Sequence, residues 1–421
     1  MKTKFLMFIT ALALLTPEGL RGTPATAPAE PISFAVIGDF GYFDSKNDYA
    51  MEVANMVKSW NPGFIITTGD NSYLKGLTKN FHNNIGRLYH EYIKLKPEFY
   101  KPEYGAQPAE NKFYPTMGNH DWDGDGGKPY SEYFSALPVN EYGHQRYYDF
   151  IKGPVHFFAL SSDPRERDTR QGDWFKRRIA ASTSRWKIVY FHHPPYTSRT
   201  GHGPTESMRW DFLGAKVTAV LTGHNHNYEQ LRIDCLPYFV VGSSGRQKLY
   251  AFSDQRIAEG SVSRYDENYG AMKVTASDER VVFEFFTRAG VSIDRYEVTT
   301  SRERPPLPPA NLSVRRVSGS RVDVKWQASS CDEAGFVLEQ STDGRTFSEV
   351  ARLDYNARSH SVTGLDPATE YFYRVRAFNN AGESGYSNID SFNPAFSPNT
   401  QFRAPARGRA RTRRRAARVR R

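Results

Sequence analysis

The chain has 421 residues, of which 39% are hydrophobic and 14% aromatic, so it exceeds one typical domain and can bury a sizeable core in two folded domains. Its formal net charge is +10, but the last nineteen residues, from Arg403, contain ten arginines and no acidic residue. The rest of the chain is therefore neutral overall, which argues against a nucleic-acid-binding fold.

Residues 1–27 have the layout of a secretory signal peptide. They begin Met-Lys-Thr-Lys, continue through an apolar run from Phe5 to Leu15, and end at Ala25-Thr26-Ala27, after which cleavage is expected. The apolar run is shorter than the ~20 residues that a membrane span needs, and no later segment is long and apolar enough. We expect a protein without a transmembrane segment that is secreted or periplasmic.

Residues 28–300 are predicted to form a catalytic domain in which apolar strands alternate with helices. Helices are expected over 45–60 and 172–182, and Asn61-Pro62-Gly63 ends the first. Continuous apolar strands bounded by Gly turns suit a sheet covered on both faces, so a layered α/β architecture is expected. The predicted strands are 32–37, 64–68, 112–117, 155–160, 186–191, 217–221 and 238–241, followed after Tyr269 by strands of period two such as 281–286.

Five short polar motifs follow these apolar runs. They are Gly38-Asp39-Phe40-Gly41, Gly69-Asp70-Asn71-Ser72-Tyr73, Gly118-Asn119-His120-Asp121, Val189-Tyr190-Phe191-His192 and Gly223-His224-Asn225-His226. A single motif of this kind would read as a turn, but five in this order place oxygen and imidazole donors where loops from neighbouring strands converge. Such donors suit Fe, Mn and Zn, and two ions about 3.5–4 Å apart can share one carboxylate. The pattern indicates a two-metal phosphoesterase centre.

The motifs resemble those of the purple acid phosphatases of the metallophosphoesterase superfamily over most of residues 32–240. The resemblance implies a layered metallophosphoesterase β-sandwich flanked by helices. Two positions separate this family from the wider superfamily: Gly41 stands where the general pattern has a His, and Tyr73 lies three residues after Asp70. A phenolate favours a trivalent ion, so Fe(III) is expected at the first position and divalent Fe, Zn or Mn at the second. The resemblance implies that Asp39, Tyr73 and His226 hold the first ion, that Asn119, His192 and His224 hold the second, and that Asp70 bridges them.

The resemblance also implies residues that face the substrate. His120 would bind the phosphate or protonate the leaving oxygen, with Asp121 orienting its ring. His202 is similar to a second substrate-facing histidine of the family, although Gly201 precedes it where relatives often carry an acidic residue or a histidine. The leaving-group acid is therefore open between His120 and His202. His193 is expected to be a structural group behind the ligand His192.

The only two cysteines, Cys235 and Cys331, are 96 positions apart and are expected in different domains. A disulfide would be possible in an oxidising compartment. Two buried free thiols are the favoured interpretation.

A second domain is predicted over residues 310–395, after a Pro-rich linker at 301–309. Its alternating strands and turns, with Trp326 in the strand 322–326, resemble a fibronectin type III β-sandwich, and 365–371 resembles that family's tyrosine corner. Such modules bind carbohydrate or protein, or act as spacers. The Arg-rich tail 396–421 is expected to be disordered and could attach to an anionic surface.

The sequence thus predicts a secreted dinuclear-metal acid phosphatase that hydrolyses phosphate monoesters by attack of a metal-bound hydroxide. One alternative is a phosphodiesterase or nucleotide hydrolase that uses the same centre, with the segment 75–107 shaping the choice of ester. A second alternative, from another class, is an adhesive protein whose catalytic domain is inactive.

Overall fold

A computed structural model describes residues 30–299 and 304–392, apart from 167, 254, 255 and 356. The expected signal peptide 1–27, the start of the linker and the Arg-rich tail 396–421 lie outside the described residues. The chain divides into two compact units, Met1–Thr299 and Thr300–Arg421, which are described separately below.

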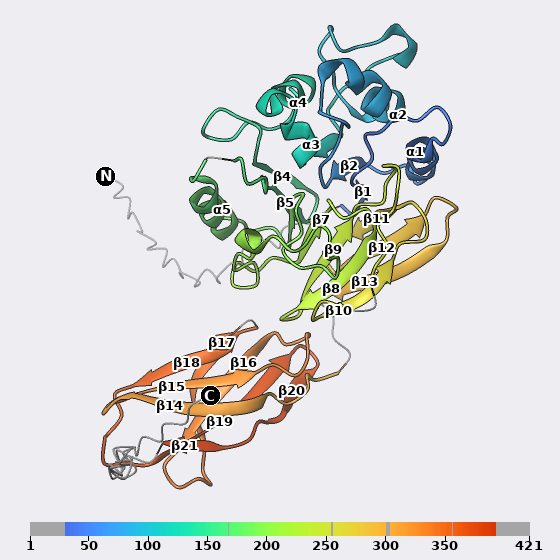
Figure 1. Ribbon diagram of the computed structural model, residues 1–421. Helices are drawn as coiled ribbons and strands as arrows, with labels where there is room; N and C mark the ends of the chain where they lie inside the picture. Colours follow the sequence, from blue (N-terminus) through green and yellow to red (C-terminus); the bar gives the residue numbers. More distant parts are fainter. Residues whose placement is uncertain (1–29, 167, 254–255, 300–303, 356, 393–421) are drawn as a thin grey trace, which may run out of the picture. The chain divides into compact units, whose positions relative to one another are not determined.

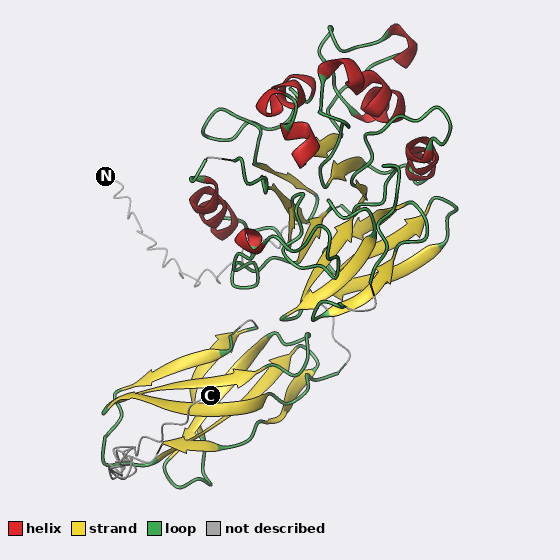
Figure 2. Cartoon of the chain, in the orientation of Figure 1, coloured by secondary structure: helices red, strands yellow, loops and turns green. Residues whose placement is uncertain are grey.

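Two mixed β-sheets form the first unit (Figures 1 and 2). One has the strand order β13-β12-β11-β1-β2-β3 and the other β10-β8-β9-β7-β6-β5-β4. The strands of the first sheet are β1 Ile32–Ile37, β2 Phe64–Thr67, β3 Phe113–Pro115, β11 Gly270–Ala276, β12 Arg280–Thr287 and β13 Ser292–Thr299. Those of the second are β4 Tyr148–Lys152, β5 Val155–Ala159, β6 Trp186–Tyr190, β7 Ala219–Thr222, β8 Tyr228–Ile233, β9 Leu236–Val241 and β10 Ser261–Tyr265.

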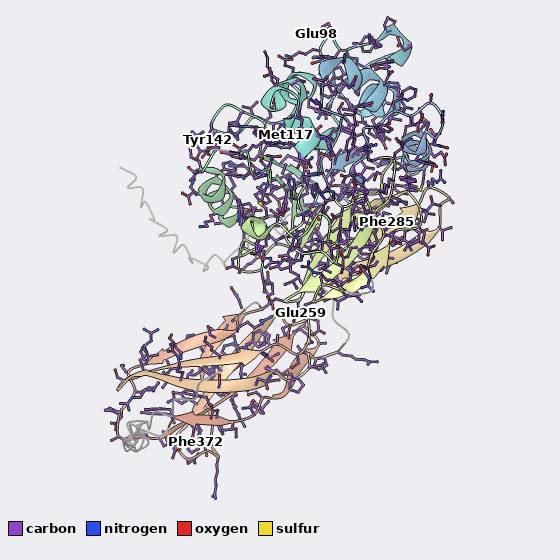
Figure 3. The ribbon with its side chains drawn as sticks, in the orientation of Figure 1. Glu98, Met117, Tyr142, Glu259, Phe285 and Phe372 are labelled. Atoms are coloured by element: carbon purple, nitrogen blue, oxygen red, sulfur yellow. The ribbon has the colours of Figure 1, made fainter. Side chains whose placement is uncertain are left out.

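The two sheets pack face to face around an aromatic core. Phe34 of β1 meets Phe157 of β5 edge to face, with ring centroids 5.1 Å apart, and Phe239 of β9 stacks with Phe283 of β12 at 4.9 Å. Figure 3 shows Phe285 of β12 and Met117 among the side chains of this unit, and both are almost fully buried. Close packing of this kind holds the strand ends in fixed positions.

Helices cover the outside of the sheets. They are α1 Tyr49–Ser59, α2 Arg87–Tyr89, α3 Asn119–Trp122, α4 Lys128–Tyr133 and α5 Gln171–Ala180, with short helical turns at Thr78–Asn80, His82–Gly86, His90–Tyr92, Pro102–Tyr104, Asp125–Gly127 and Glu206–Met208. Figure 1 shows α1 to α4 gathered on one side of the strands. The helix predicted over 45–60 begins only at Tyr49, because the Asp48 side chain accepts a hydrogen bond from the Met51 amide and caps it.

Parallel pairing brings the predicted site loops together. The strands β1, β2 and β3 are mutually parallel, as are β5, β6, β7 and β9, so their carboxyl ends point the same way within each sheet. The predicted layered α/β fold class is confirmed. Loops from both sheets of the sandwich carry the predicted site residues.

The second unit is entirely β. Its sheets have the orders β14-β15-β18 and β17-β16-β19-β20, and β21 pairs with β19. The strands are β14 Ala310–Ser318, β15 Arg321–Gln327, β16 Gly335–Ser341, β17 Ser348–Asp354, β18 Ser359–Thr363, β19 Tyr371–Asn379, β20 Gly382–Tyr386 and β21 Asp390–Phe392. Trp326 is buried against Phe336, and the Tyr371 hydroxyl accepts a 3.1 Å hydrogen bond from the Asp366 amide, as in a tyrosine corner.

The favoured interpretation of the cysteines as two buried free thiols is wrong. Both Cys235 and Cys331 are disulfide-bonded. Neither is buried, since Cys235 lies in the turn between β8 and β9 and Cys331 in the exposed loop before β16, where thiols are accessible to oxidation.

Among the described residues, no helix combines the length and the apolar character that a membrane crossing requires.

Candidate metal centre

All seven predicted ligands lie at the carboxyl ends of parallel strands. Asp39 follows β1, Asp70 and Tyr73 follow β2, Asn119 begins α3 after β3, His192 follows β6, and His224 and His226 lie between β7 and β8. The carboxyl groups of Asp39 and Asp70 and the His192 ring are almost fully buried.

Three of these residues have a left-handed backbone. The φ angles of Asp39, Asp70 and His224 are 54°, 52° and 67°, a region that residues other than glycine rarely adopt. Each strand therefore ends in a sharp turn that aims its donor at the centre. Because packing must hold such residues in place, their concentration here points to function.

The neighbouring glycines leave room for the donors. A Cβ atom on Gly118 would lie 2.1 Å from Oδ1 of Asp70, and one on Gly69, whose φ is +96°, would lie 2.6 Å from Nδ1 of His192. Any side chain at these positions would displace a predicted ligand.

One group of donors surrounds the Tyr73 hydroxyl. This hydroxyl donates a 2.7 Å hydrogen bond to Oδ2 of Asp70 and lies 3.1 Å from Oδ1 of Asp39. Nε2 of His226 is 3.3 Å from the same hydroxyl. These are the residues expected around the first ion.

A second group surrounds Nε2 of His192. This nitrogen lies 3.1 Å from Oδ1 of Asn119, 3.1 Å from Nδ1 of His224 and 3.4 Å from Oδ1 of Asp70. Asp70 thus contacts both groups, one with each carboxyl oxygen, as expected of a bridging ligand.

Backbone carbonyls fix the orientation of two of the imidazoles. Nδ1 of His192 donates to the Thr68 carbonyl at 2.8 Å, and Nδ1 of His226 donates to the Lys248 carbonyl at 3.1 Å. Each Nε2 then carries no proton and presents a lone pair to the site, which is the usual arrangement of a metal-binding histidine.

The seven side chains that converge here are all electron-pair donors: two carboxyl groups, a phenol, an amide and three imidazoles. Burial and the neighbouring Asp70 raise the pKa of Asp39 well above its ordinary value. Two buried carboxyl groups facing unprotonated imidazole nitrogens fit a pair of bound cations.

His120 lies beside the first donor group. Its ring centroid is 4.4 Å from that of Tyr73, and its backbone amide donates to Oδ1 of Asp70 at 3.0 Å. Nδ1 donates to the Leu74 carbonyl at 2.7 Å, while Nε2 lies 3.9 Å from Oδ2 of Asp70. The ring is therefore oriented by a main-chain carbonyl, with Nε2 on the side of the centre.

Asp121 does not orient the His120 ring, contrary to expectation. Its carboxylate accepts hydrogen bonds from the backbone amides of Asn71, Ser72 and Gly118, at 3.1, 3.1 and 2.8 Å, and from the Asn71 side chain. Burial and the nearby Asp70 raise its pKa to about 7 despite these bonds. Asp121 instead joins the Asp70 loop to the Asn119 loop.

The two remaining histidines flank the second group. The exposed ring of His202 lies 4.7 Å from that of His224 and stacks with Tyr250 at 5.4 Å. His193 is buried behind His192, and its Nδ1 lies 3.0 Å from the Ser162 hydroxyl. Its imidazole is also close enough to those of His192 and His224 to join them around one ion.

Sequence reasoning missed two arginines near the centre. Arg246 lies over the rings of Tyr42 and Tyr73, at 4.4 and 4.8 Å, and its amide donates to the Asp39 carbonyl. Arg165 donates to the Asn119 carbonyl at 2.9 Å. The turn Gly242-Ser243-Ser244-Gly245 after a buried strand is the one sequence signal that precedes Arg246.

Comparison with protein families identifies both parts of the chain. Residues 32–228 match the model of the calcineurin-like phosphoesterases. The first unit is a calcineurin-like phosphoesterase domain. Residues 307–392 match the fibronectin type III domain, in the second unit.

Relatives of the phosphoesterase domain carry the name expected from the motifs. The chain is 28% identical over 302 residues to purple acid phosphatase 3 of Arabidopsis thaliana, covering 64% of this chain and 76% of that protein. It is 25% identical over 276 residues to the tartrate-resistant acid phosphatase type 5 of Sus scrofa, covering 58% and 78%.

A solved structure shares the fold. The purple acid phosphatase PPD1 from yellow lupin seeds superimposes with a TM-score of 0.51 at 16% identity, covering 64% of this chain and 54% of that chain. The predicted relationship to the purple acid phosphatases, with a C-terminal fibronectin type III domain, is confirmed.

Proposed function

We propose that this chain is an exported acid phosphatase that hydrolyses phosphate monoesters at a dinuclear metal centre. The observation that carries the proposal is the contact of Asp70 with two donor groups, one around Tyr73 and one around His192. The acid phosphatase activity named for the relatives supports it. Export is supported by the sequence of residues 1–27 and by the disulfide-bonded cysteines.

The seven donors would divide between two ions. Asp39, Tyr73 and His226 would hold an Fe(III) ion, Asn119, His192 and His224 a divalent Fe, Zn or Mn ion, and Asp70 would contribute to both. Bound cations of this kind would polarise the phosphate and acidify the attacking water. The hard phenol oxygen of Tyr73 is the donor that favours the trivalent ion.

His120 would transfer the proton to the leaving group. Its Nδ1 is held by the Leu74 carbonyl, so Nε2 is the nitrogen that can take up a proton on the side of Asp70 and deliver it to the leaving oxygen. His202 would instead hold a phosphate oxygen, since its ring lies against His224 at the second donor group.

The test is to assay the purified protein on an aryl phosphate monoester and a bis-aryl phosphate diester near pH 5, with a visible spectrum and metal analysis. We expect about two metal ions including iron, a charge-transfer band in the visible range, and a clear preference for the monoester. Preference for the diester would favour the phosphodiesterase alternative. A protein that binds metal and hydrolyses neither ester would favour the inactive adhesive protein.

A further inference from the structure

A pocket opens next to the metal centre at Tyr73. It has a volume of about 450 Å³, within the range typical of small-molecule sites. Two segments line it, one before α1 and one after Tyr73. The lining residues are Tyr42, Phe43, Tyr73, Leu74, Lys75, Leu77, Lys79, Asn80, Asn83 and Asn84. We call it the Tyr73 pocket.

Apolar side chains in the Tyr73 pocket are exposed to solvent. Phe43, Leu74 and Leu77 are 43%, 60% and 37% exposed, although the same unit buries most of its large apolar residues. Exposed apolar groups gathered beside a predicted reaction centre indicate a surface that is covered when a ligand binds.

The pocket is held in a fixed shape. Arg246 lies over Tyr42, and Arg87, which is paired with Asp48 at 2.6 Å, lies over the Phe43 ring at 4.8 Å. The buried Asn84 side chain donates to the Tyr73 carbonyl at 2.6 Å. The pocket wall is thus tied to the segment that carries a predicted metal ligand.

Two lysines give the pocket a positive charge. Lys75 and Lys79 are exposed, and neither forms an ion pair within the part of the chain that the structure describes. Among the described residues, no acidic side chain lines the pocket. Together with the apolar residues, this favours a ligand that is both flat and negatively charged.

We propose that the Tyr73 pocket binds the leaving group of the phosphate ester and favours an aromatic group that carries a second negative charge. This inference rests on the proposed phosphatase function. His120 connects the two sites, because its ring packs on Tyr73 and its Nδ1 donates to the carbonyl of Leu74, a pocket residue. An ester whose phosphate lies at the centre would then have its leaving oxygen next to His120 and its ring in the pocket.

Three monoesters test this proposal: glycerol 2-phosphate, 2-naphthyl phosphate and 6-carboxy-2-naphthyl phosphate. They would be compared in the wild type, in Leu77→Ser and in the double variant Lys75→Ala/Lys79→Ala. Lys96→Ala is the matched control, since Lys96 is an exposed lysine of the same segment outside the pocket. Comparing each variant with the wild type on the same ester removes differences in intrinsic reactivity.

We expect the lysine double variant to lower kcat/KM for the carboxylated ester by roughly 5-fold relative to 2-naphthyl phosphate, an effect that weakens as salt rises. Leu77→Ser should lower kcat/KM for both naphthyl esters by roughly 3-fold. Glycerol 2-phosphate, whose leaving group has neither a ring nor a second charge, should lose least in both variants, and Lys96→Ala should resemble the wild type. Equal losses on all three esters, or no loss on any, would overturn the proposal.

A binding measurement separates this proposal from the proposed function. Saturation-transfer NMR with 6-hydroxy-2-naphthoate should detect binding to the wild type, with or without metal, and a weaker signal with the lysine double variant. If the wild type hydrolyses none of the esters but gives a stronger NMR signal than the lysine double variant, the proposed phosphatase function is wrong while the proposal of an anion-binding pocket stands. Equal signals from both proteins would exclude the pocket as an anion-binding site.

Discussion

The hydroxyl of Tyr73 donates a 2.7 Å hydrogen bond to Oδ2 of Asp70, three residues earlier in the chain. Burial and the carboxyl groups of Asp39 and Asp70 raise the pKa of Tyr73 well above its ordinary value, so the phenol keeps its proton in this environment. Only a strong Lewis acid would replace that proton. The Tyr73 hydroxyl is therefore the donor that would favour Fe(III) over a divalent ion at the first position.

Tyr73→Phe should remove the visible charge-transfer band and weaken iron binding by more than ~10-fold. Loss of a residue that only hydrogen-bonds to a metal ligand already lowers metal affinity by about 10–100-fold. Absorption spectra and iron titration measure both effects. Tyr89→Phe is the control, because the buried Tyr89 hydroxyl has no hydrogen-bond partner among the described residues. An unchanged spectrum in Tyr73→Phe would remove this residue from the ligand set.

Asp70→Asn should abolish binding of two ions and phosphatase activity together, because Asp70 reaches both donor groups. The metal-free variant should be somewhat less stable than the metal-free wild type, since an amide is a weaker acceptor than a carboxylate for the hydrogen bonds from the Tyr73 hydroxyl and the His120 amide. Metal-to-protein ratios, phosphate release and thermal unfolding with and without chelator check these outcomes. Retained activity with two bound ions would contradict the bridging role.

His120→Ala and His202→Ala should differ in their dependence on the leaving group. Loss of a general acid costs about 10²–10⁴-fold, and most for a basic leaving group. We expect His120→Ala to lose far more on phenyl phosphate than on 4-nitrophenyl phosphate, and His202→Ala to lose equally on both. The reverse pattern would make His202 the acid.

Glu229 is expected to position the loop that carries His202. Its buried carboxylate accepts hydrogen bonds from the Thr197 hydroxyl at 3.0 Å, the Ser198 amide at 2.9 Å and the Ser261 hydroxyl at 2.7 Å. Glu229→Gln should cost about 1.5–3 kcal/mol of stability through lost charged hydrogen bonds. It should also change KM for phosphate esters at unchanged metal content, whereas a purely structural role would leave KM unaltered in the folded fraction.

Asp168 should stabilise the phosphoesterase domain in a pH-dependent way. Hydrogen bonds from Arg170 at 2.7 Å, Tyr147 at 2.8 Å and His144 at 3.0 Å hold the pKa of Asp168 well below its ordinary value. Because the folded-state pKa is lower than that of the unfolded chain, ~3.9, the unfolded state takes up the proton first as the pH falls. The stabilisation is complete above about pH 5 and declines in stronger acid.

Asp168→Asn should therefore lower the free energy of unfolding near pH 7 by about 1.5–3 kcal/mol. The difference in the free energy of unfolding between Asp168→Asn and the wild type should become smaller as the pH falls below ~4. Denaturant unfolding at a series of pH values measures this difference. Glu98→Gln is the control, since Glu98 is exposed and lies at the periphery of the first unit in Figure 3. A difference that is constant with pH would show that the charge of Asp168 does not contribute.

The sequence predicted those parts of the fold and site that are fixed locally. The strand 32–37 coincides with β1, and the motifs lie at the ends of β1, β2, β3, β6 and β7. Apolar runs specify the strands without reference to the rest of the chain, and at every one of these ends except that of β6 a Gly marks the turn. The grouping of the seven donors follows from parallel pairing. Their roles as ligands stay a prediction that the experiments above test.

Features that depend on long-range packing were not predicted. The partners of the Asp121 carboxylate include backbone amides of a loop about fifty residues away. The position of Arg246 over Tyr73 depends on how the end of β9, in one sheet, meets the ends of β1 and β2 in the other. The Tyr73 pocket arises where two segments meet, so neither segment reveals it alone. The oxidation of the cysteines depends on surface position, which periodicity does not give.

The left-handed backbone at Asp39, Asp70 and His224 bears on how this protein would change if its chemistry were no longer selected. Glycine adopts that conformation without strain and would also remove a buried carboxyl group or imidazole from the centre. Substitutions that abolish catalysis are thus expected to relieve strain in the fold. Descendants released from selection would lose these three side chains early and keep the aromatic core between the sheets, so that an inactive copy would be recognised by glycines at the strand ends in an otherwise intact domain.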